Sequence, residues 1–262
     1  MTARKACEGC RNGEALGFAF AMAFQPIVEL PRGRVWGYEA LVRGPAGEPA
    51  HQVLGKVDAE NRYRFDQACR VKAIETAAAL FPRDEDLKLS INFMPNAVYE
   101  PAACLRTSLA AAERTGMPRE NILFEFTEQE EIRDVGHVER IIGEYRRHGF
   151  MTAIDDFGAG YAGLNLLAKF QPDLLKIDME LIRGIEGSHA RQVILSALVW
   201  AARNLDVRLL AEGVESEAEL TVLRAAGIEL FQGYHFARPA FQALPDVPIL
   251  APTAEPGAAA RA

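Results

Sequence analysis

Acidic, amide and lysine side chains recur along this chain where short apolar runs, typical of buried strands, come to an end. The gaps between them run from 20 to 53 residues, most of them about one strand plus one helix. One or two acidic residues at such places would simply begin a loop. A polar residue near the end of each of seven strands is hard to explain by packing and indicates a functional site. The residues are Glu39, Asn92, Glu125, Asp155, Asp156, Lys176, Glu212 and Gln232.

The acidic residues and Asn92 offer oxygen donors, and no histidine or cysteine falls in the same register. Oxygen donors favour Mg²⁺, Mn²⁺ or Ca²⁺ over Zn²⁺. Five carboxylates exceed what one Mg²⁺ usually takes from a protein, so we expect two ions, with Asp155 and Asp156 as the bridge. Such a site activates water and stabilises the attacking and leaving oxygens of a phosphodiester displacement. Lys176 could hold or deprotonate the water or neutralise transition-state charge; the alternative is a structural ion pair.

Strand-like and helix-like runs alternate from end to end, which favours a largely parallel sheet covered by helices. The expected strands are 22–29, 35–42, 87–93, 122–127, 151–155, 174–177, 207–212 and 229–232. The expected helices are 65–80, 101–114, 134–148, 161–170, 188–204 and 216–226. Ser216 and Asp134 are candidate N-caps, and Gly149 and Gly227 stand where helices end.

Eight strand candidates over one domain predict a closed (β/α)8 barrel, in which the carboxyl ends of the strands converge on one face. The first two runs are joined only by residues 30–34, a hairpin length, whereas a parallel pair needs about a dozen residues or more. We therefore expect a modified TIM barrel with one antiparallel strand near the N-terminus.

The chain has 262 residues, a formal net charge of −7 and 49% hydrophobic residues. This composition excludes wholesale disorder, and the acidic balance argues against a DNA-binding protein. No apolar run reaches the roughly 18 residues of a membrane span. Residues 16–24 loosely resemble a signal peptide; the alternative is a buried first strand.

The ends of the chain differ from its middle. Residues 1–15 are expected to form an N-terminal arm with the C-x-x-C pair Cys7 and Cys10, residues 16–244 the barrel, and residues 245–262, rich in Ala and Pro, a loose tail. Four cysteines are too few for a disulfide scaffold and there is no second C-x-x-C pair for zinc. Reduced thiols in a cytoplasmic protein are the simpler interpretation; a metal or redox role is the alternative.

The candidate residues lie in strings that resemble the EAL-domain cyclic di-GMP phosphodiesterases. Glu39-Ala40-Leu41 is similar to the signature of that family, whereas Glu14-Ala15-Leu16 precedes the first strand and is a decoy. The similar strings are 24–28, 38–43, 90–92, 124–128, 153–161, 176–178, 211–215 and 232–236. Because the match begins near residue 22, it also favours the first strand over a signal peptide.

The resemblance implies hydrolysis of cyclic di-GMP to linear pGpG. It implies ligands for two Mg²⁺ or Mn²⁺ ions at Glu39, Asn92, Glu125, Asp155, Asp156 and Glu212. It makes Lys176, together with Glu39, catalytic. The implied substrate contacts are Gln25, Leu41, Arg43, Asp178 and Gln232, with Arg43 on a phosphate.

The resemblance also concerns regulation. Glu128 is similar to the glutamate that anchors the loop after the paired aspartates, and Glu215 to the second glutamate of the Glu-Gly-Val-Glu string. Members of the family commonly form homodimers through helices beside that loop. Here the loop has Ala159, Ala162 and Gly163 where hydroxyl residues are frequent, which puts its regulation in doubt more than its chemistry.

Three functions remain open at this stage. The leading one is an active phosphodiesterase, because the ligand set is complete and Lys176 is present. A separate sensor or regulator protein is a possible partner, since residues 61–67 resemble EAL domains coupled to blue-light-sensing flavin domains and this sequence shows no such domain. The second is a catalytically silent EAL domain that binds cyclic di-GMP or a protein. The third is a barrel phosphodiesterase for another phosphate ester.

Overall fold

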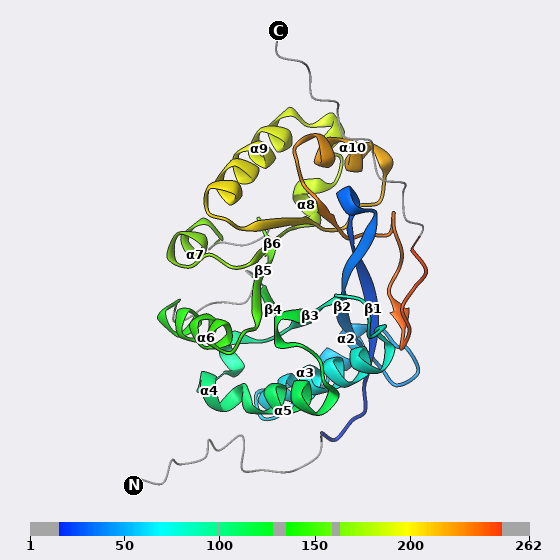
Figure 1. Cartoon of the computed structure of the whole chain (residues 1–262), viewed down its shortest axis with the longest axis vertical. Helices are drawn as coiled ribbons and strands as arrows, with labels where there is room; N and C mark the ends of the chain where they lie inside the picture. The colour runs from blue at the N-terminus through cyan, green and yellow to red at the C-terminus, as the bar shows by residue number, and fades with distance from the viewer. Residues whose placement is uncertain (1–15, 99, 128–134, 159–162, 248–262) are drawn as a thin grey trace.

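A closed eight-stranded barrel surrounded by helices forms the centre of the molecule (Figure 1). The computed structural model describes residues 16–98, 100–127, 135–158 and 163–247. The barrel strands are β1 (Ala21–Glu29), β2 (Arg34–Arg43), β3 (Lys88–Asn92), β4 (Ile122–Thr127), β5 (Met151–Phe157), β6 (Leu174–Ile177), β7 (Arg208–Ala211) and β8 (Leu230–Phe231). A ninth strand, β9 (Ala240–Phe241), pairs with β1 outside the barrel.

The strand order confirms the modified TIM barrel. Strands β2 to β8 follow one another as parallel neighbours, and β1 closes the ring between β8 and β2, antiparallel to both. The antiparallel strand is therefore the first. The turn after it is a single 3₁₀ turn, Leu30–Arg32, that ends at Gly33 with φ 57°, a left-handed conformation that glycine adopts without strain.

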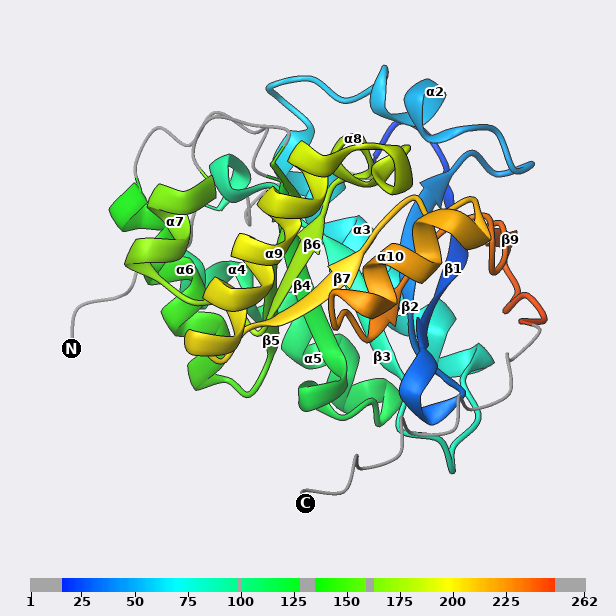
Figure 2. The ribbon, with the colours of Figure 1, turned by 90° about the horizontal axis from the view of Figure 1, so that it is seen from above.

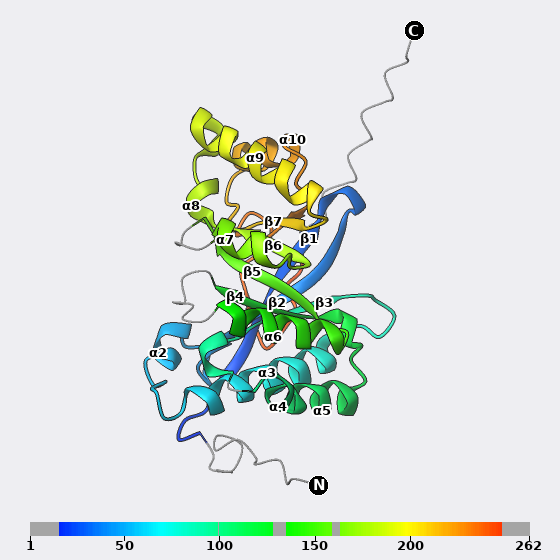
Figure 3. The ribbon, with the colours of Figure 1, turned by 90° about the vertical axis from the view of Figure 1, so that its left-hand side faces the viewer.

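The helices cover the outside of the barrel (Figures 2 and 3). They are α2 (Ala50–Leu54), α3 (Arg62–Leu80), α4 (Pro101–Cys104), α5 (Arg106–Thr115), α6 (Val135–Arg147), α7 (Gly163–Lys169), α8 (Met179–Ile182), α9 (His189–Asn204) and α10 (Glu217–Ala225). The helix expected over 101–114 is broken at Leu105 into α4 and α5. Among the described residues, no helix is long and apolar enough to cross a membrane.

The expected helix ends are largely confirmed. Ser216 caps α10 through a capping box with Glu219, and Ser188 caps α9. Gly149 and Gly227 have φ 85° and 92°, so both occupy the left-handed conformation of a helix end. The N-cap predicted at Asp134 lies outside the described residues.

A layer of apolar side chains lies beneath the functional residues. Residues Ile27, Leu123, Ala153, Leu174, Leu210 and Leu230 belong to one buried cluster. Each stands two positions from a candidate site residue, which lies on the same strand or directly follows it. Because side chains alternate between the faces of a strand, both members of each pair point into the barrel. The same alternation that packs the interior therefore directs the polar residues to the same side.

A buried ion pair within α3 packs against α6 and against aromatic side chains of the barrel. Arg70 is fully buried, with Nη2 2.6 Å from Asp66 and Nη1 donating to the hydroxyl of Tyr145 on α6. Its guanidinium also lies 5.1 Å from the ring centroid of Phe93. Burial raises the pKa of Asp66 although the charge of Arg70 opposes this. Contacts with Tyr145 and Phe93 therefore hold the pair in place, although both charges have lost their hydration on burial.

We expect Arg70→Met to lower the free energy of unfolding by about 3 kcal/mol, because it leaves the Asp66 carboxylate buried without its cation. The loss should be larger at neutral pH than at about pH 4, since a carboxyl group with a raised folded-state pKa loses stability as pH rises. Urea unfolding at both pH values measures it. As the control, Arg114→Met, which breaks an exposed pair with Glu75, should cost under about 1 kcal/mol.

Candidate active site

Lys176 on β6 is the centre of the site and is fully buried. Its ammonium lies 2.8 Å from Glu212, 3.0 Å from Asp155, 3.1 Å from Glu125 and 3.7 Å from Glu39. These carboxylates come from β2, β4, β5 and the residue after β7. The predicted convergence of carboxylates from successive strands is therefore present in the structure, although Glu39, Glu125 and Asp155 lie inside their strands and only Glu212 follows one.

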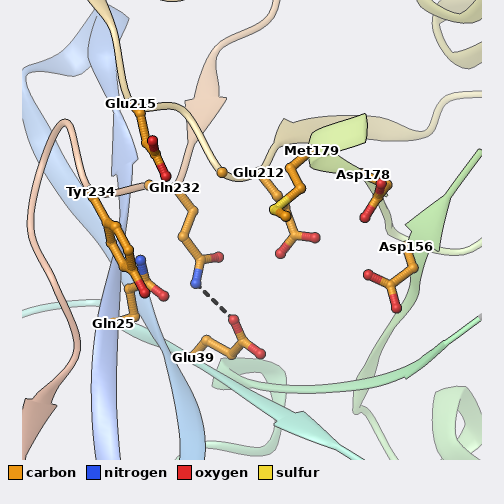
Figure 4. A pocket seen from close by; sticks show the side chains of 11 residues that line it. Gln25, Glu39, Asp156, Asp178, Met179, Glu212, Glu215, Gln232 and Tyr234 are labelled. Atoms are coloured by element: carbon orange, nitrogen blue, oxygen red, sulfur yellow. Dashed lines mark hydrogen bonds between the residues drawn. The ribbon is translucent and has the colours of Figure 1, made fainter. Parts of the chain in front are cut away.

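A hydrogen-bond network orients the carboxylates. Asn92 Nδ2 donates to Glu39 Oε1 at 3.0 Å and to Glu125 Oε1 at 2.9 Å. Ser90, two residues earlier on β3, donates its hydroxyl to the other oxygen of Glu125 at 2.5 Å. Gln232 Nε2 donates to Glu39 Oε2 at 2.7 Å (Figure 4). Both oxygens of Glu39 and both of Glu125 thus have a fixed direction.

Two overlapping groups of carboxylate oxygens have spacing suited to a cation. In each group the oxygens lie within 4.8 Å of one another: Glu39, Glu125 and Asp155 form one, and Asp155, Asp156 and Glu212 the other. Asp155 belongs to both. Every donor is an oxygen, so the residues fit a hard divalent ion.

Asp156 is placed by an unusual backbone conformation. Its φ is 53°, in the left-handed region that non-glycine residues rarely adopt. In a regular strand Asp156 would point to the face opposite Asp155. Thr127 Oγ1 donates to the Asp156 carboxylate at 2.8 Å, which holds it beside its neighbour. Such local strain is common at functional sites.

The charges of the cluster shift one another's pKa values. Burial, and then the neighbouring carboxylates, raise the pKa of Glu125 and that of Glu212 well above the usual range. For Asp155 burial is the largest single influence and raises the pKa, but the Lys176 ammonium together with hydrogen bonds to Glu212, to Lys176 and from the Asp156 amide lowers it overall. For Lys176 the surrounding carboxylates outweigh burial and raise its pKa well above normal. Lys176 is consequently held as a cation.

A pocket of about 330 Å³ opens above this cluster (Figure 4). It is lined by Gln25, Glu39, Asp156, Asp178, Met179, Glu212, Gly213, Glu215, Gln232, Gly233 and Tyr234. Gln25 and Glu39 face each other as a cross-strand pair of β1 and β2. Glu39 thus lies in the interior of β2 and not at its end, because β2 continues to Arg43 alongside β1.

The other predicted residues are distributed around this pocket. Gln25, Asp178 and Gln232 line it, while Leu41 lines a neighbouring apolar cavity of about 360 Å³ that also reaches Asn92. Arg43 donates to the carbonyl oxygen of Val42 at 2.7 Å and lines neither. Glu215 lies on the pocket and pairs with Arg183 at 3.0 Å. Glu128 lies outside the described residues.

The sequence reasoning gave no role to four residues that the structure places here. Ser90, Thr127 and Tyr234 stand inside the strings that carried the resemblance, and Met179 directly follows Asp178. Ser90, Thr127 and Tyr234 each stand two residues from a predicted site residue, and Met179 stands next to one. These spacings were the only signals in the sequence that could have indicated their place in the site.

Comparison with known proteins identifies the family. The family model described as the EAL domain matches residues 14–239. The chain belongs to the EAL domain family. Among solved structures, the EAL domain resembles a standalone versatile EAL protein from Vibrio cholerae in its c-di-GMP bound form, with 54% identity, a TM-score of 0.85, and coverage of 89% of this chain and 97% of that one.

Two further EAL proteins are informative. The Blue light- and temperature-regulated antirepressor BluF of Escherichia coli is 33% identical over 86% of this chain and 55% of its own length. The Cyclic di-GMP phosphodiesterase PA2567 of Pseudomonas aeruginosa is 31% identical over 84% of this chain and 38% of its own length. The chain thus spans about half or less of these curated relatives.

We expect Mg²⁺ or Mn²⁺ to raise the thermal unfolding midpoint by about 5–10 °C at 100 times its dissociation constant, since ions that bind the folded state stabilise it. Asp155→Asn should reduce this shift most, because Asp155 belongs to both oxygen groups. The matched control is Glu215→Gln, which removes the same charge from the pocket outside both groups. Differential scanning fluorimetry measures the metal-induced shift of the unfolding midpoint. Equal shifts in the two variants would contradict the assignment of Asp155 to the metal site.

Proposed function

We propose that the chain hydrolyses cyclic di-GMP to linear pGpG with two Mg²⁺ or Mn²⁺ ions. The observation that carries the proposal is the pair of overlapping carboxylate groups that share Asp155 around Lys176, beneath an open pocket. The phosphodiesterase name of the Pseudomonas aeruginosa relative supports the same reaction.

The oxygen donors would divide between the two ions. Glu39, Asn92 and Glu125 would serve one side, Asp156 and Glu212 the other, with Asp155 between them. When bound, the ions supply charge neutralisation and an activated water for an in-line displacement. A complex of Klebsiella pneumoniae BlrP1 with manganese and cyclic di-GMP, 37% identical with a TM-score of 0.78, supports this choice of metal.

Lys176 and Glu39 have separate tasks in this proposal. Lys176, held as a cation by its neighbours, donates to an oxygen of the reacting phosphate and offsets the negative charge that develops there. Glu39 keeps its carboxylate toward the reacting centre because Asn92 and Gln232 fix both of its oxygens. Neither residue has to reorganise during the reaction.

The substrate contacts follow from the positions of polar side chains. Gln25, Asp178 and Gln232 face the pocket and can bond the edge of a base or a ribose. Leu41 would contribute an apolar contact on the neighbouring side, and Arg43 a charge for a phosphate. Residues 1–15 and 245–262 would stay outside this unit, and the whole would work in the cytoplasm under a separate sensor or regulator.

The second candidate function is a silent EAL domain that acts as a cyclic di-GMP-binding or protein-interaction signalling module. The similarity to BluF, named an antirepressor, favours it. It differs from the first in one measurable respect, since a silent domain binds cyclic di-GMP without turning it over.

Incubation of the purified chain with cyclic di-GMP and Mg²⁺ or Mn²⁺ should yield linear pGpG on chromatography. Glu39→Ala and Lys176→Ala should each lower kcat by at least about 100-fold, because each removes a charge from the reacting centre. Glu113→Ala, an exposed acid on α5, is the control. Intact cyclic di-GMP with both metals would reject the phosphodiesterase, and full activity of Lys176→Ala would reject its role.

We further propose a homodimer through the helices that follow β5 and β6, namely α7 and α9. These helices are neighbours on the outside of the barrel (Figures 2 and 3). The outer face of α9 carries Val193, Ile194 and Trp200, which are 53%, 50% and 70% exposed, and Leu164 on α7 is 67% exposed. Large apolar side chains exposed on neighbouring helices are typical of a protein interface.

Trp200→Glu should convert the dimer to a monomer, because it replaces the most exposed apolar side chain of α9 by a charge. Light scattering coupled to size-exclusion chromatography measures the mass. Phe241→Glu, on β9 at a distance from α9 in Figures 1 and 2, should leave the mass unchanged. A monomeric parent protein would contradict the proposal.

A further inference from the structure

Arg183 is a cation behind the acidic pocket, in the loop that follows β6 and directly after α8. Its side chain is 41% exposed and does not line the pocket. Its Nη2 donates to the carbonyl oxygen of Gly213 at 3.2 Å and lies 3.0 Å from Glu215, while its Nη1 donates to Glu219 at 3.2 Å. These three partners all follow β7. One planar guanidinium therefore joins the loop after β6 to the loop after β7.

The carbonyl group that Arg183 binds lies next to Glu212, whose carboxylate is directed into the pocket in Figure 4. The amide of Glu212 donates to the last residue of β6, and the amide of Val214 donates to the residue after β8, each at 3.1 Å. Between them Gly213 has φ 65°, and a Cβ on it would lie 2.5 Å from the Cβ of Met179. Arg183 thus fixes the carbonyl group of a tightly confined turn, and the direction of the Glu212 side chain depends on that turn.

Glu219 is the buried partner of Arg183 and is only 3% exposed. Its Oε1 also accepts from the amide of Gly184 at 3.3 Å, and its Oε2 accepts from the amides of Glu215 and Ser216 at 3.0 and 3.2 Å. Donors from both loops thus meet on one carboxylate. Hydrogen bonds of a charged group are roughly twice as strong as neutral ones, so this contact holds the two loops in register.

A second pair of the same kind lies at the other end of β7. The Nη2 of Arg208 is 3.0 Å from the buried carboxylate of Glu29, and the side chain of Arg208 is 39% exposed. Arg208 is the first residue of β7, whereas Glu212 directly follows the last. The two arginines therefore resemble each other in exposure and in partner, and they differ in their distance along the strand from the oxygen groups.

We propose that Arg183 is a positioning residue for Glu212, and through it for the cation that Asp155, Asp156 and Glu212 would hold. The inference rests on the proposed function, since it assumes divalent ions in the acidic cluster. Replacing a partner that orients metal ligands commonly lowers metal affinity by about 10–100-fold. The other oxygen group is carried by β2, β4 and β5 and has no residue on this loop. Arg183 consequently acts on one ion of the two.

The test is a titration of the full chain with Mn²⁺ in the absence of nucleotide, in which the paramagnetic resonance signal of free Mn²⁺ gives the number of bound ions. We expect Arg183→Met to weaken one of two ions by about tenfold or more and to leave the other within about twofold of the parent. Arg183→Lys keeps the charge but not the planar fork. It should bind the affected ion more tightly than Arg183→Met and less tightly than the parent.

Arg208→Met is the matched control, because it removes an equally exposed arginine from a pair with a buried carboxylate. It should lower the urea midpoint of the metal-free protein about as much as Arg183→Met and leave both Mn²⁺ affinities within about twofold of the parent. If Arg183→Met does not fold, Arg183→Lys decides the matter by the same titration.

Unchanged Mn²⁺ affinities in the folded Arg183 variants overturn the proposal. Equal weakening of both ions, or the same weakening in Arg208→Met, would indicate a general loss of structure and also overturns it, as does a parent protein that binds fewer than two Mn²⁺ ions. A parent protein that binds two ions but never hydrolyses cyclic di-GMP rejects the phosphodiesterase alone, and the titration still decides the role of Arg183.

Discussion

The burial of one ammonium among carboxylates is the constraint on which the site depends. Without Lys176, the side chains of Glu39, Glu125, Asp155 and Glu212 would meet in the barrel with no opposing charge among the described residues. Mutual repulsion and burial would then favour their protonation, as the raised pKa values of Glu125 and Glu212 already indicate. Lys176 keeps the acids together in a geometry that divalent ions can use.

The antiparallel first strand places Gln25 opposite Glu39, a pairing that depends on its reversed direction. Because β1 runs antiparallel to β2, Gln25 and Glu39 become direct cross-strand partners, and both line the pocket. Gln232, the residue after β8, then reaches Glu39 from the other side of β1. Strand β1 thus pairs with β2 on one side and with β8 on the other. The pairing that closes the barrel therefore also brings Gln232 to Glu39 and orients its carboxylate.

The loop after β7 depends on a second charged group. Arg183 donates to the carbonyl oxygen of Gly213 and to Glu219, each at 3.2 Å, and pairs with Glu215. Glu219 also accepts from the amides of Glu215 and Ser216 at the start of α10. Glu212 and Glu215 therefore stand on a loop fixed at both ends, which explains how residues outside regular strands can hold precise positions.

The sequence by itself determined the alternation of strands and helices, the single antiparallel strand, and the family. The alternation and the antiparallel strand follow from local patterns, namely apolar runs of strand and helix length and a connection too short for a parallel crossover. The family follows from the resemblance of the strings around the site residues. The register of the ligand candidates could be read for the same reason, because alternation along a strand fixes which residues share a face. The break of the helix 101–114 at Leu105 was missed, since nothing local in its apolar spacing marks it.

Only the tertiary structure decided which of these residues meet and in what order. That Asp155, and not the Asp155-Asp156 pair as a unit, belongs to both oxygen groups depends on the left-handed conformation of Asp156 and on Thr127 from a neighbouring strand. The separation of Leu41 and Arg43 from the acidic pocket, and the stacking of Arg238 on Tyr234, also arise from contacts outside the strand pattern. Sequence periodicity fixes the face on which a side chain lies, whereas distances between side chains are set by the barrel's closure and by the packing of every element around it.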